Sequence, residues 1–140
     1  MELSYILKLR NALKPELRHM PLFQNGSAII VENKEKEILL EEKVDREIWC
    51  LPGGLQELGE TFEEVAIREL FEEDLVLIDV ISGESRKNSY PNGDEVYNNT
   101  VLYCVSNYTG TLNCDYAEIT DNNNSNFVMQ KESKDLKFFN

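Results

Sequence analysis

The stretch from Gly54 to Val76 constrains this chain most, because it combines helical periodicity with a high density of carboxylates. Between residues 57 and 74 it holds eight carboxylates and a single cation, Arg68. The carboxylates are Glu57, Glu60, Glu63, Glu64, Glu69, Glu72, Glu73 and Asp74. So much negative charge in a short run repels itself unless cations bind nearby. We therefore expect a fold that brings positive charge to this segment.

The helical spacing indicates where a cation would bind. Glu69, Glu72 and Glu73 stand at i, i+3 and i+4 and so share one helix face. The same face is apolar one and two turns earlier, at Phe62, Val65 and Ala66. A stripe that begins apolar and ends in carboxylates predicts a helix face turned into the protein. Carboxylates held there need partners, and hard divalent cations such as Mg²⁺ prefer oxygen ligands.

The start of this helix carries two local signals. Thr61, with Glu64 three residues later, forms a capping-box sequence that predicts the first turn of the helix. Glu64 and Arg68 stand at i and i+4 in the favourable order, which predicts an ion pair along the helix surface.

Gly54, Glu60, the run Arg68-Glu69-Leu70 and the pair Glu72-Glu73 follow the spacing G-x5-E-x7-R-E-U-x-E-E-x-G-U, where U is a bulky aliphatic residue. This spacing resembles the Nudix box, and six of its seven fixed letters are present. Leu75 stands where the box has its last glycine. That glycine would end the helix in a left-handed conformation, so we expect a strained helix exit downstream of most metal ligands.

The resemblance implies an α/β Nudix fold, a mixed β-sheet sandwiched between helices. With 140 residues the chain can bury one substantial core. We therefore expect one Nudix domain over residues 1–140, with an N-terminal helical segment at 1–20 and the box at 54–76.

The coarse pattern of elements agrees with an α/β domain. We expect a helix near residues 3–13, stopped by Pro15, that serves packing or an oligomer contact. Strands are predicted at 21–33 and 37–42, and the aliphatic run from Leu75 to Ile81 predicts a buried strand. Two further strands, about 85–90 and 95–106, are joined through Asn92-Gly93, which is a hairpin signal. The run from Leu136 to Phe139 is expected to return to the body.

The resemblance also implies a reaction. Nudix hydrolases cleave a diphosphate bond in a nucleoside diphosphate linked to another moiety, such as a nucleoside triphosphate, ADP-ribose or a dinucleoside polyphosphate. Divalent metal neutralises phosphate oxygens and lowers the pKa of bound water. A donor set built from carboxylates favours Mg²⁺, with Mn²⁺ as a substitute, over zinc.

Roles for individual residues follow from the resemblance position by position. The metal ligands would be the carbonyl of Gly53 and the carboxylates of Glu60, Glu69, Glu72 and Glu73. Of the catalytic residues Glu69, Arg68 and Glu72, Glu69 would bind metal or act as general base, and Arg68 would orient a carboxylate. Either Glu118 or Glu132 could supply a further carboxylate from a late loop.

Substrate recognition has weaker signals. Phosphate groups need cations, for which Arg46 and Arg86 are candidates, with Lys87 as another. An aromatic platform for a base is expected from Tyr90, with Tyr97, Trp49 and Phe23 as alternatives.

Composition excludes several other functions. A net charge of −12 argues against binding of bulk nucleic acid or anionic membranes. No apolar run has the length of a membrane span and no signal peptide opens the chain, so we expect a cytoplasmic protein. Three cysteines, at 50, 104 and 114, are expected to be reduced thiols. The sequence leaves open whether the protein forms a homodimer.

Two alternatives compete with a hydrolase. Leu75 in the glycine position would suit a Nudix-fold nucleotide sensor that does not cleave. An isomerase of the isopentenyl diphosphate type shares the fold, but the box matches the hydrolase pattern better.

Overall fold

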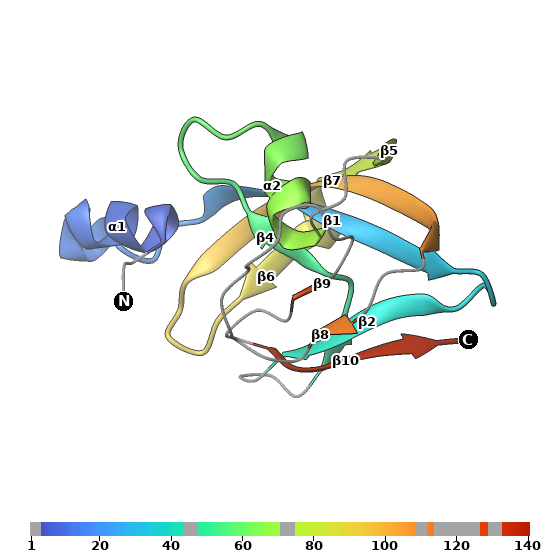
Figure 1. Cartoon of the computed structure of the whole chain (residues 1–140). Helices are drawn as coiled ribbons and strands as arrows, with labels where there is room; N and C mark the ends of the chain where they lie inside the picture. Colours follow the sequence, from blue (N-terminus) through green and yellow to red (C-terminus); the bar gives the residue numbers. More distant parts are fainter. Residues whose placement is uncertain (1–3, 44–47, 71–74, 109–111, 114–126, 129–132) are drawn as a thin grey trace.

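The computed structural model describes residues 4–43, 48–70, 75–108, 112–113, 127–128 and 133–140. Its centre is a mixed eight-stranded sheet whose main path runs β10-β2-β1-β7-β5 (Figure 1). The two longest strands, β1 and β7, run parallel from the pair Leu22 and Val96 to the pair Asn33 and Tyr108. The strands of this path are β1 (Leu22–Asn33), β2 (Ile38–Lys43), β5 (Val76–Ile81), β7 (Glu95–Tyr108) and β10 (Ser133–Phe139).

Shorter strands join this path from its sides. β3 (Trp49–Cys50) pairs with β2, β4 (Gly53–Leu55) with β1, and β6 (Lys87–Ser89) with β7. β8 (Leu112–Asn113) and β9 (Phe127–Val128) form a separate parallel pair. β1 pairs with β2 only at Glu32 and with β4 at Gly26 to Ala28. The two partners thus share one edge of β1, and β4 is the partner beside the central helix.

Within the described residues, two α-helices and two short 3-10 helices accompany the sheet. They are α1 (Tyr5–Ala12), η1 (Pro15–Leu17), α2 (Phe62–Leu70) and η2 (Glu84–Arg86). α2 packs on one face of the sheet over β1 and β4, whereas α1 lies beyond the end of the sheet (Figure 1). None of the described helices is long and apolar enough to cross a membrane.

The core lies between α2 and the sheet. Alternate residues of a strand face opposite sides, and in β1 the buried side chains of Ser27, Ile29 and Val31 face α2. Ile29 and Val31 pack with Ala66 of α2 in one apolar cluster. This cluster also includes Leu39, Val101, Tyr103, Val105, Tyr108 and Leu136. Burial of this apolar surface is the main term that holds α2 on the sheet.

One buried cation fixes α1. Arg10 is 4 % exposed and donates through Nη1 to the carbonyls of Arg18 at 2.7 Å and Met20 at 2.9 Å. Its Nη2 donates to the carbonyl of Glu95 at 2.7 Å, and its Nε lies 3.5 Å from Asp94 Oδ2. Arg10 therefore ties α1 to the turn between β6 and β7.

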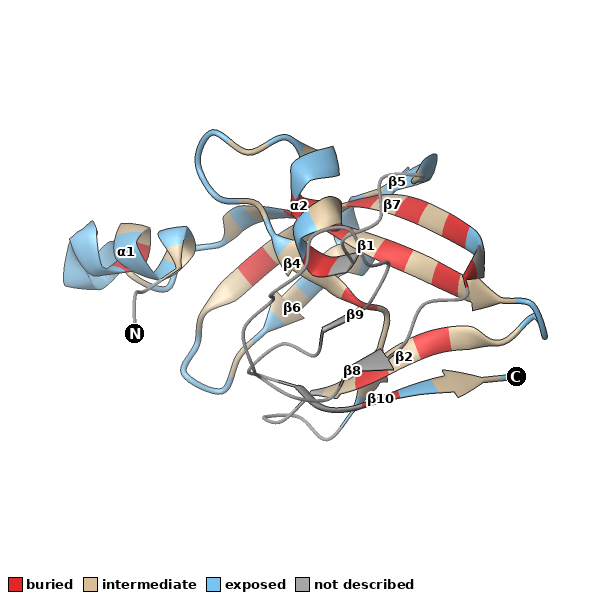
Figure 2. Ribbon diagram, viewed as in Figure 1, coloured by how far each residue is buried: buried red, intermediate tan, exposed pale blue. Residues whose placement is uncertain are grey.

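Most predicted elements are confirmed, including the turn at Asn92-Gly93, where Gly93 has a φ of 95°. Residues 75–81 were predicted to form a buried strand, and the prediction that this strand is buried is wrong. β5 forms, but Val76, Leu77 and Val80 are 62 %, 58 % and 59 % exposed (Figure 2). Among the described elements only β7 makes more than marginal contact with β5, the last strand at its edge of the sheet, and local sequence does not encode this position.

Candidate active site

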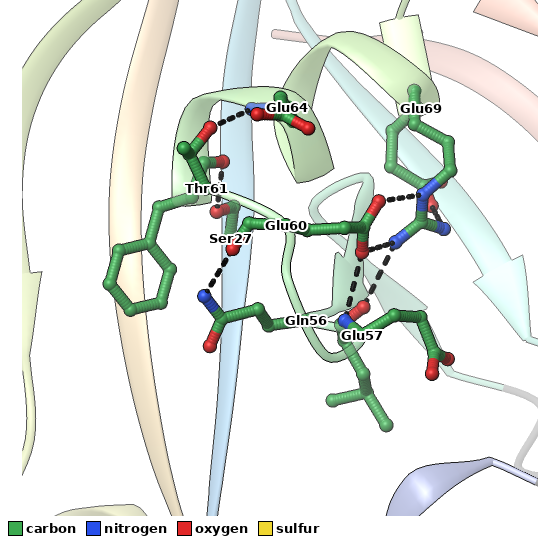
Figure 3. Close-up of polar contacts among 10 residues, drawn as sticks. Ser27, Gln56, Glu57, Glu60, Thr61, Glu64 and Glu69 are labelled. Carbon is green, nitrogen blue, oxygen red and sulfur yellow. Dashed lines mark hydrogen bonds and ion pairs between the residues drawn. The ribbon is translucent and has the colours of Figure 1, made fainter.

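The first turn of α2 is fixed by its cap and by the sheet. Thr61 Oγ1 accepts the N–H of Glu64 at 3.0 Å, which confirms the predicted cap (Figure 3). The Thr61 carbonyl accepts the N–H of Val65 at 3.1 Å, the first helical bond. From the sheet, Ser27 Oγ donates to the Phe62 carbonyl at 2.7 Å. These hydrogen bonds therefore fix the position of the start of α2 over β1.

The inward-turned face of α2 is confirmed for the residues that the structure describes. Val65 and Ala66 are fully buried, and Glu69 at the end of the stripe is only 2 % exposed. Glu69 Oε1 lies 2.5 Å from the point where a Cβ on residue 54 would stand. A side chain larger than that of Gly54 would therefore displace the carboxylate of Glu69.

Glycines also allow β4 to lie against β1. A Cβ on Gly26 would stand 2.5 Å from the carbonyl oxygen of Gly54, and a Cβ on Gly53 would stand 2.5 Å from the carbonyl oxygen of Ser27. Side chains at these positions would separate the two strands. The consequence is that the backbone of Gly54, the residue after the predicted ligand Gly53, lies beside the carboxylate of Glu69.

Arg68 connects the box loop to Glu69. Its Nε and Nη2 donate to the two oxygens of Glu60 at 3.1 and 3.0 Å, and Nη2 also donates to the Leu55 carbonyl at 2.9 Å. Its Nη1 lies 3.4 Å from Glu69 Oε1. The predicted pair of Arg68 with Glu64 is wrong. The loop folds back and offers a two-pronged carboxylate contact with Glu60, which is the stronger geometry for a guanidinium.

The charges of this network are mutually stabilising. Glu60 Oε1 also accepts the N–H of Glu57 at 2.8 Å. The hydrogen bonds from Arg68 hold the pKa of Glu60 below its ordinary value of 4.5, against the opposing effect of burial. Burial alone would lower the pKa of Arg68, but its contacts with Glu60 and Glu69 outweigh burial and raise it. Both groups are therefore ionised at neutral pH.

Part of the predicted site lies outside the described residues. These are the expected metal ligands Glu72 and Glu73, the expected phosphate contact Arg46, and the late-loop candidates Glu118 and Glu132. Within the described ranges, no group of three His, Cys, Asp or Glu side chains gathers around one point. Leu75, in the glycine position of the box, is described and packs against the core cluster.

Arg86 and Tyr90, two of the candidates for substrate binding, line different hollows. Arg86 lines a hollow of about 490 Å³ on the sheet face opposite α2. Its guanidinium is fixed there by the Asn98 carbonyl at 3.3 Å and by Thr100 Oγ1 at 3.0 Å. Tyr90 lines a second hollow of about 520 Å³ between α1 and the turn before β7. Gln24 and Leu55 line both, so the two hollows adjoin.

Sequence reasoning missed the polar side chains of the first hollow. Gln24, Asn98 and Thr100 lie on β1 and β7, on the face that points away from α2. The available signal was the alternation along β7, where Asn98 and Thr100 stand on one face of the strand with Val96 and Leu102. That signal cannot be used until the parallel pairing of β1 and β7 is known.

The comparison with protein families decides the identity of the fold. A model of the NUDIX domain matches residues 22–135. The chain belongs to the Nudix family. The matched range includes Glu60, Arg68 and Glu69.

One curated protein is similar to part of the chain. A Bacillus subtilis (strain 168) protein named "Putative 8-oxo-dGTP diphosphatase" is 42 % identical over 52 residues, which are 37 % of this chain and 35 % of that protein. The match thus spans about a third of the curated relative.

Two solved structures resemble the whole chain. A MutT/nudix family protein from Enterococcus faecalis has a TM-score of 0.52 at 18 % identity, and the alignment covers 99 % of this chain and 51 % of that one. The NUDIX domain of Shewanella oneidensis NrtR, solved with ADP ribose, has a TM-score of 0.51 at 15 % identity. This alignment covers 98 % of this chain and 83 % of that one. These likenesses confirm the predicted Nudix α/β fold.

Proposed function

We propose that this chain is a metal-dependent Nudix pyrophosphohydrolase. Its substrate would be a nucleoside diphosphate linked to another moiety: a nucleoside triphosphate, ADP-ribose or a dinucleoside polyphosphate. The observation that carries the proposal is the buried carboxylate of Glu69, which lies against the backbone of Gly54 and within reach of Arg68. The names of the Bacillus protein and the ligand of the Shewanella domain support a nucleotide substrate.

The donor set fits a hard divalent cation. The space that a Cβ on Gly54 would fill is occupied by a carboxylate oxygen, so this part of the box is shaped around an acidic group. Glu69, Glu72, Glu73 and the carbonyl of Gly53 would hold Mg²⁺ or Mn²⁺ through oxygen. When bound, the metal would neutralise phosphate oxygens and supply a more acidic water.

Glu60 would reach the metal through water. Its two oxygens already accept three hydrogen bonds, two from Arg68 and one from the N–H of Glu57. This makes Glu60 a positioning residue, because it fixes the guanidinium that faces Glu69. Arg68 in turn lies 3.4 Å from Glu69 Oε1 and would orient this carboxylate, which would bind metal or accept a proton.

The remaining roles complete the proposal. Arg86 and Arg46 would bind phosphate, and Tyr90 would pack against a bulky part of the substrate in the second hollow. Glu72 would share the catalytic role of Glu69. The protein would act in the cytoplasm on small nucleotides, either as a monomer or as a homodimer.

The experiment is a substrate panel with and without metal. Purified protein is incubated with nucleoside triphosphates, ADP-ribose and dinucleoside polyphosphates in Mg²⁺, Mn²⁺ or a chelator, and phosphate products are followed. We expect metal-dependent turnover on at least one substrate. Glu69→Gln should lower turnover by about two orders of magnitude or more with unchanged circular dichroism. The matched control is Glu64→Gln on the exposed side of the same helix, which should retain activity.

The outcomes separate the candidate functions. If Glu69→Gln keeps full activity, the assignment of the site is wrong. If the wild type cleaves nothing yet binds one nucleotide tightly, the chain is a nucleotide sensor and not a hydrolase.

A further inference from the structure

Two amide side chains meet at the polar end of the 490 Å³ hollow. Gln24 on β1 and Asn98 on β7 are register partners in the parallel pair, and Gln24 Nε2 donates to Asn98 Oδ1 at 2.9 Å. Both residues are partly buried and both line the hollow. Amides placed in a concave site otherwise walled by apolar groups are the usual means by which a small-molecule site fixes the orientation of its ligand.

The bond between these amides leaves a defined hydrogen-bonding capacity. A carboxamide has two donors and one acceptor oxygen with two lone pairs. With one bond made between them, Gln24 still offers its Oε1 acceptor and Asn98 still offers its Nδ2 donor. If both amides turn over, the pair again offers one donor and one acceptor. The pair therefore presents a donor beside an acceptor, which complements the hydrogen-bonding edge of a nucleobase.

The rest of the hollow suits a nucleotide. Its volume of about 490 Å³ lies within the range of ligand sites. Ala28, Leu51, Ile81 and Leu102 give it apolar walls for the faces of a base. Arg86 lies at the same site, held by Asn98 and Thr100, and supplies the cation that a phosphate or a ribose hydroxyl would need.

We propose that Gln24 and Asn98 recognise the base of the nucleotide by hydrogen bonds to an edge that carries a donor beside an acceptor. This inference rests on the proposed nucleotide hydrolase function and names the group that selects the base. Gln24 and Asn98 would be specificity residues, with no part in bond cleavage.

The chain contains a matched control for this pair. One residue further along the same strands, Asn99 Nδ2 donates to Asn25 Oδ1 at 3.1 Å. This second amide pair joins the same two strands but points to the opposite face of the sheet. Asn99→Ala therefore removes an equivalent bond between β1 and β7 without touching the hollow, and it reports any purely structural cost.

The test measures binding without turnover. In the presence of a chelator, the Kd values of the four common nucleoside 5′-monophosphates are measured by NMR titration, with ribose 5-phosphate as the base-free probe. We expect at least one monophosphate to bind more tightly than ribose 5-phosphate. Gln24→Ala and Asn98→Ala should each weaken that binding about tenfold or more and leave the Kd of ribose 5-phosphate unchanged. Asn99→Ala should change neither value.

Several outcomes would overturn the inference. It is wrong if ribose 5-phosphate binds as tightly as every monophosphate, or if the variants weaken both probes equally. Because the titration needs no hydrolysis, a protein that recognises bases but cleaves nothing would contradict the proposed function alone. A protein that cleaves but loses no base recognition in these variants would contradict only the inference.

A second variant keeps the contact between the strands. Asn98→Asp retains an oxygen to accept from Gln24 Nε2 but replaces the donor with an acceptor. The pair would then offer two acceptors, which complement the adjacent N1–H and N2–H donors of guanine. We expect the ratio of guanosine to adenosine monophosphate affinity to rise about tenfold. An unchanged ratio, in a variant with an unchanged Tm, would contradict base reading by this pair.

Discussion

α2 and β5 lie close together in the sequence, and both are rich in aliphatic residues, but the fold treats them in opposite ways. In α2, Val65 and Ala66 are fully buried and even the carboxylate of Glu69 is removed from water. In β5, Val76 and Val80 are about 60 % exposed. Hydrophobicity thus determined which element formed in each segment, whereas burial was determined by the position of that element relative to the sheet.

The exposed strand carries its own protection against pairing with other chains. The register between β5 and β7 shifts between Leu77 and Asp79, and such bulges interrupt the flat edge that another strand would need. Asp79 Oδ1 also accepts the N–H of Val80 at 2.8 Å, which occupies a donor at this edge. A carboxylate thus lies on the exposed strand in β5, whereas the carboxylate of Glu69 in α2 is buried.

The largest expected effect concerns the space that α2 and β4 share. In Gly54→Ala, the new Cβ would displace the end of the flexible Glu69 side chain. Turnover should fall about 100-fold, because a displacement of about 1 Å in a catalytic group has that effect, while the Tm changes little. The control is Gly26→Ala, where the Cβ meets the backbone of Gly54 and the cost should appear as lost stability. Full activity in Gly54→Ala would show that the position of Glu69 is not critical.

The next effect tests the difference in burial directly. Val65→Ala in α2 should lower the free energy of unfolding by about 2 kcal/mol, because a fully buried side chain is truncated. Val80→Ala in β5 makes the same chemical change at an exposed site and should alter stability by less than about 0.5 kcal/mol. Urea denaturation measures both. Equal losses would mean that β5 is covered in solution and that the contrast does not hold.

The smallest effect concerns the charge network at the start of the box. Glu60→Gln should lower the free energy of unfolding by about 0.5–1 kcal/mol at pH 7, because the ion pair with Arg68 is partly exposed. Since folding lowers the pKa of Glu60 from 4.5, its contribution is complete above that pH. It is lost as the pH falls through the lowered value. The difference between wild type and variant should therefore vanish in acid, whereas Glu35→Gln, at an exposed turn, should leave the free energy of unfolding at pH 7 unchanged.

Local signals predicted the parts of the fold that local interactions determine. The cap at Thr61, the hairpin turn at Gly93 and the inward position of Glu69 all follow from residue types at short spacing, and the structure confirms each. The family resemblance added the overall fold, which the family match and the solved relatives confirm.

Features that depend on distant parts of the chain could not be predicted. The partner of Arg68 is Glu60 and not Glu64, because the path of the box loop decides which carboxylate is near. The amide pair of Gln24 and Asn98 joins residues 74 positions apart. Its existence depends on the parallel register of β1 and β7. The roles of all predicted site residues, including Glu72, Glu73 and Arg46, stay predictions.

The clamp formed by Arg10 has a consequence for biosynthesis. Its guanidinium donates to a carbonyl 85 positions later in the chain, so the first helix leaves the ribosome long before its acceptor exists. α1 cannot be locked in place until the polypeptide has been translated through β7. An ordered amino-terminal helix would therefore mark a nascent chain that has reached β7, and limited proteolysis of stalled translation products would reveal the order of these events.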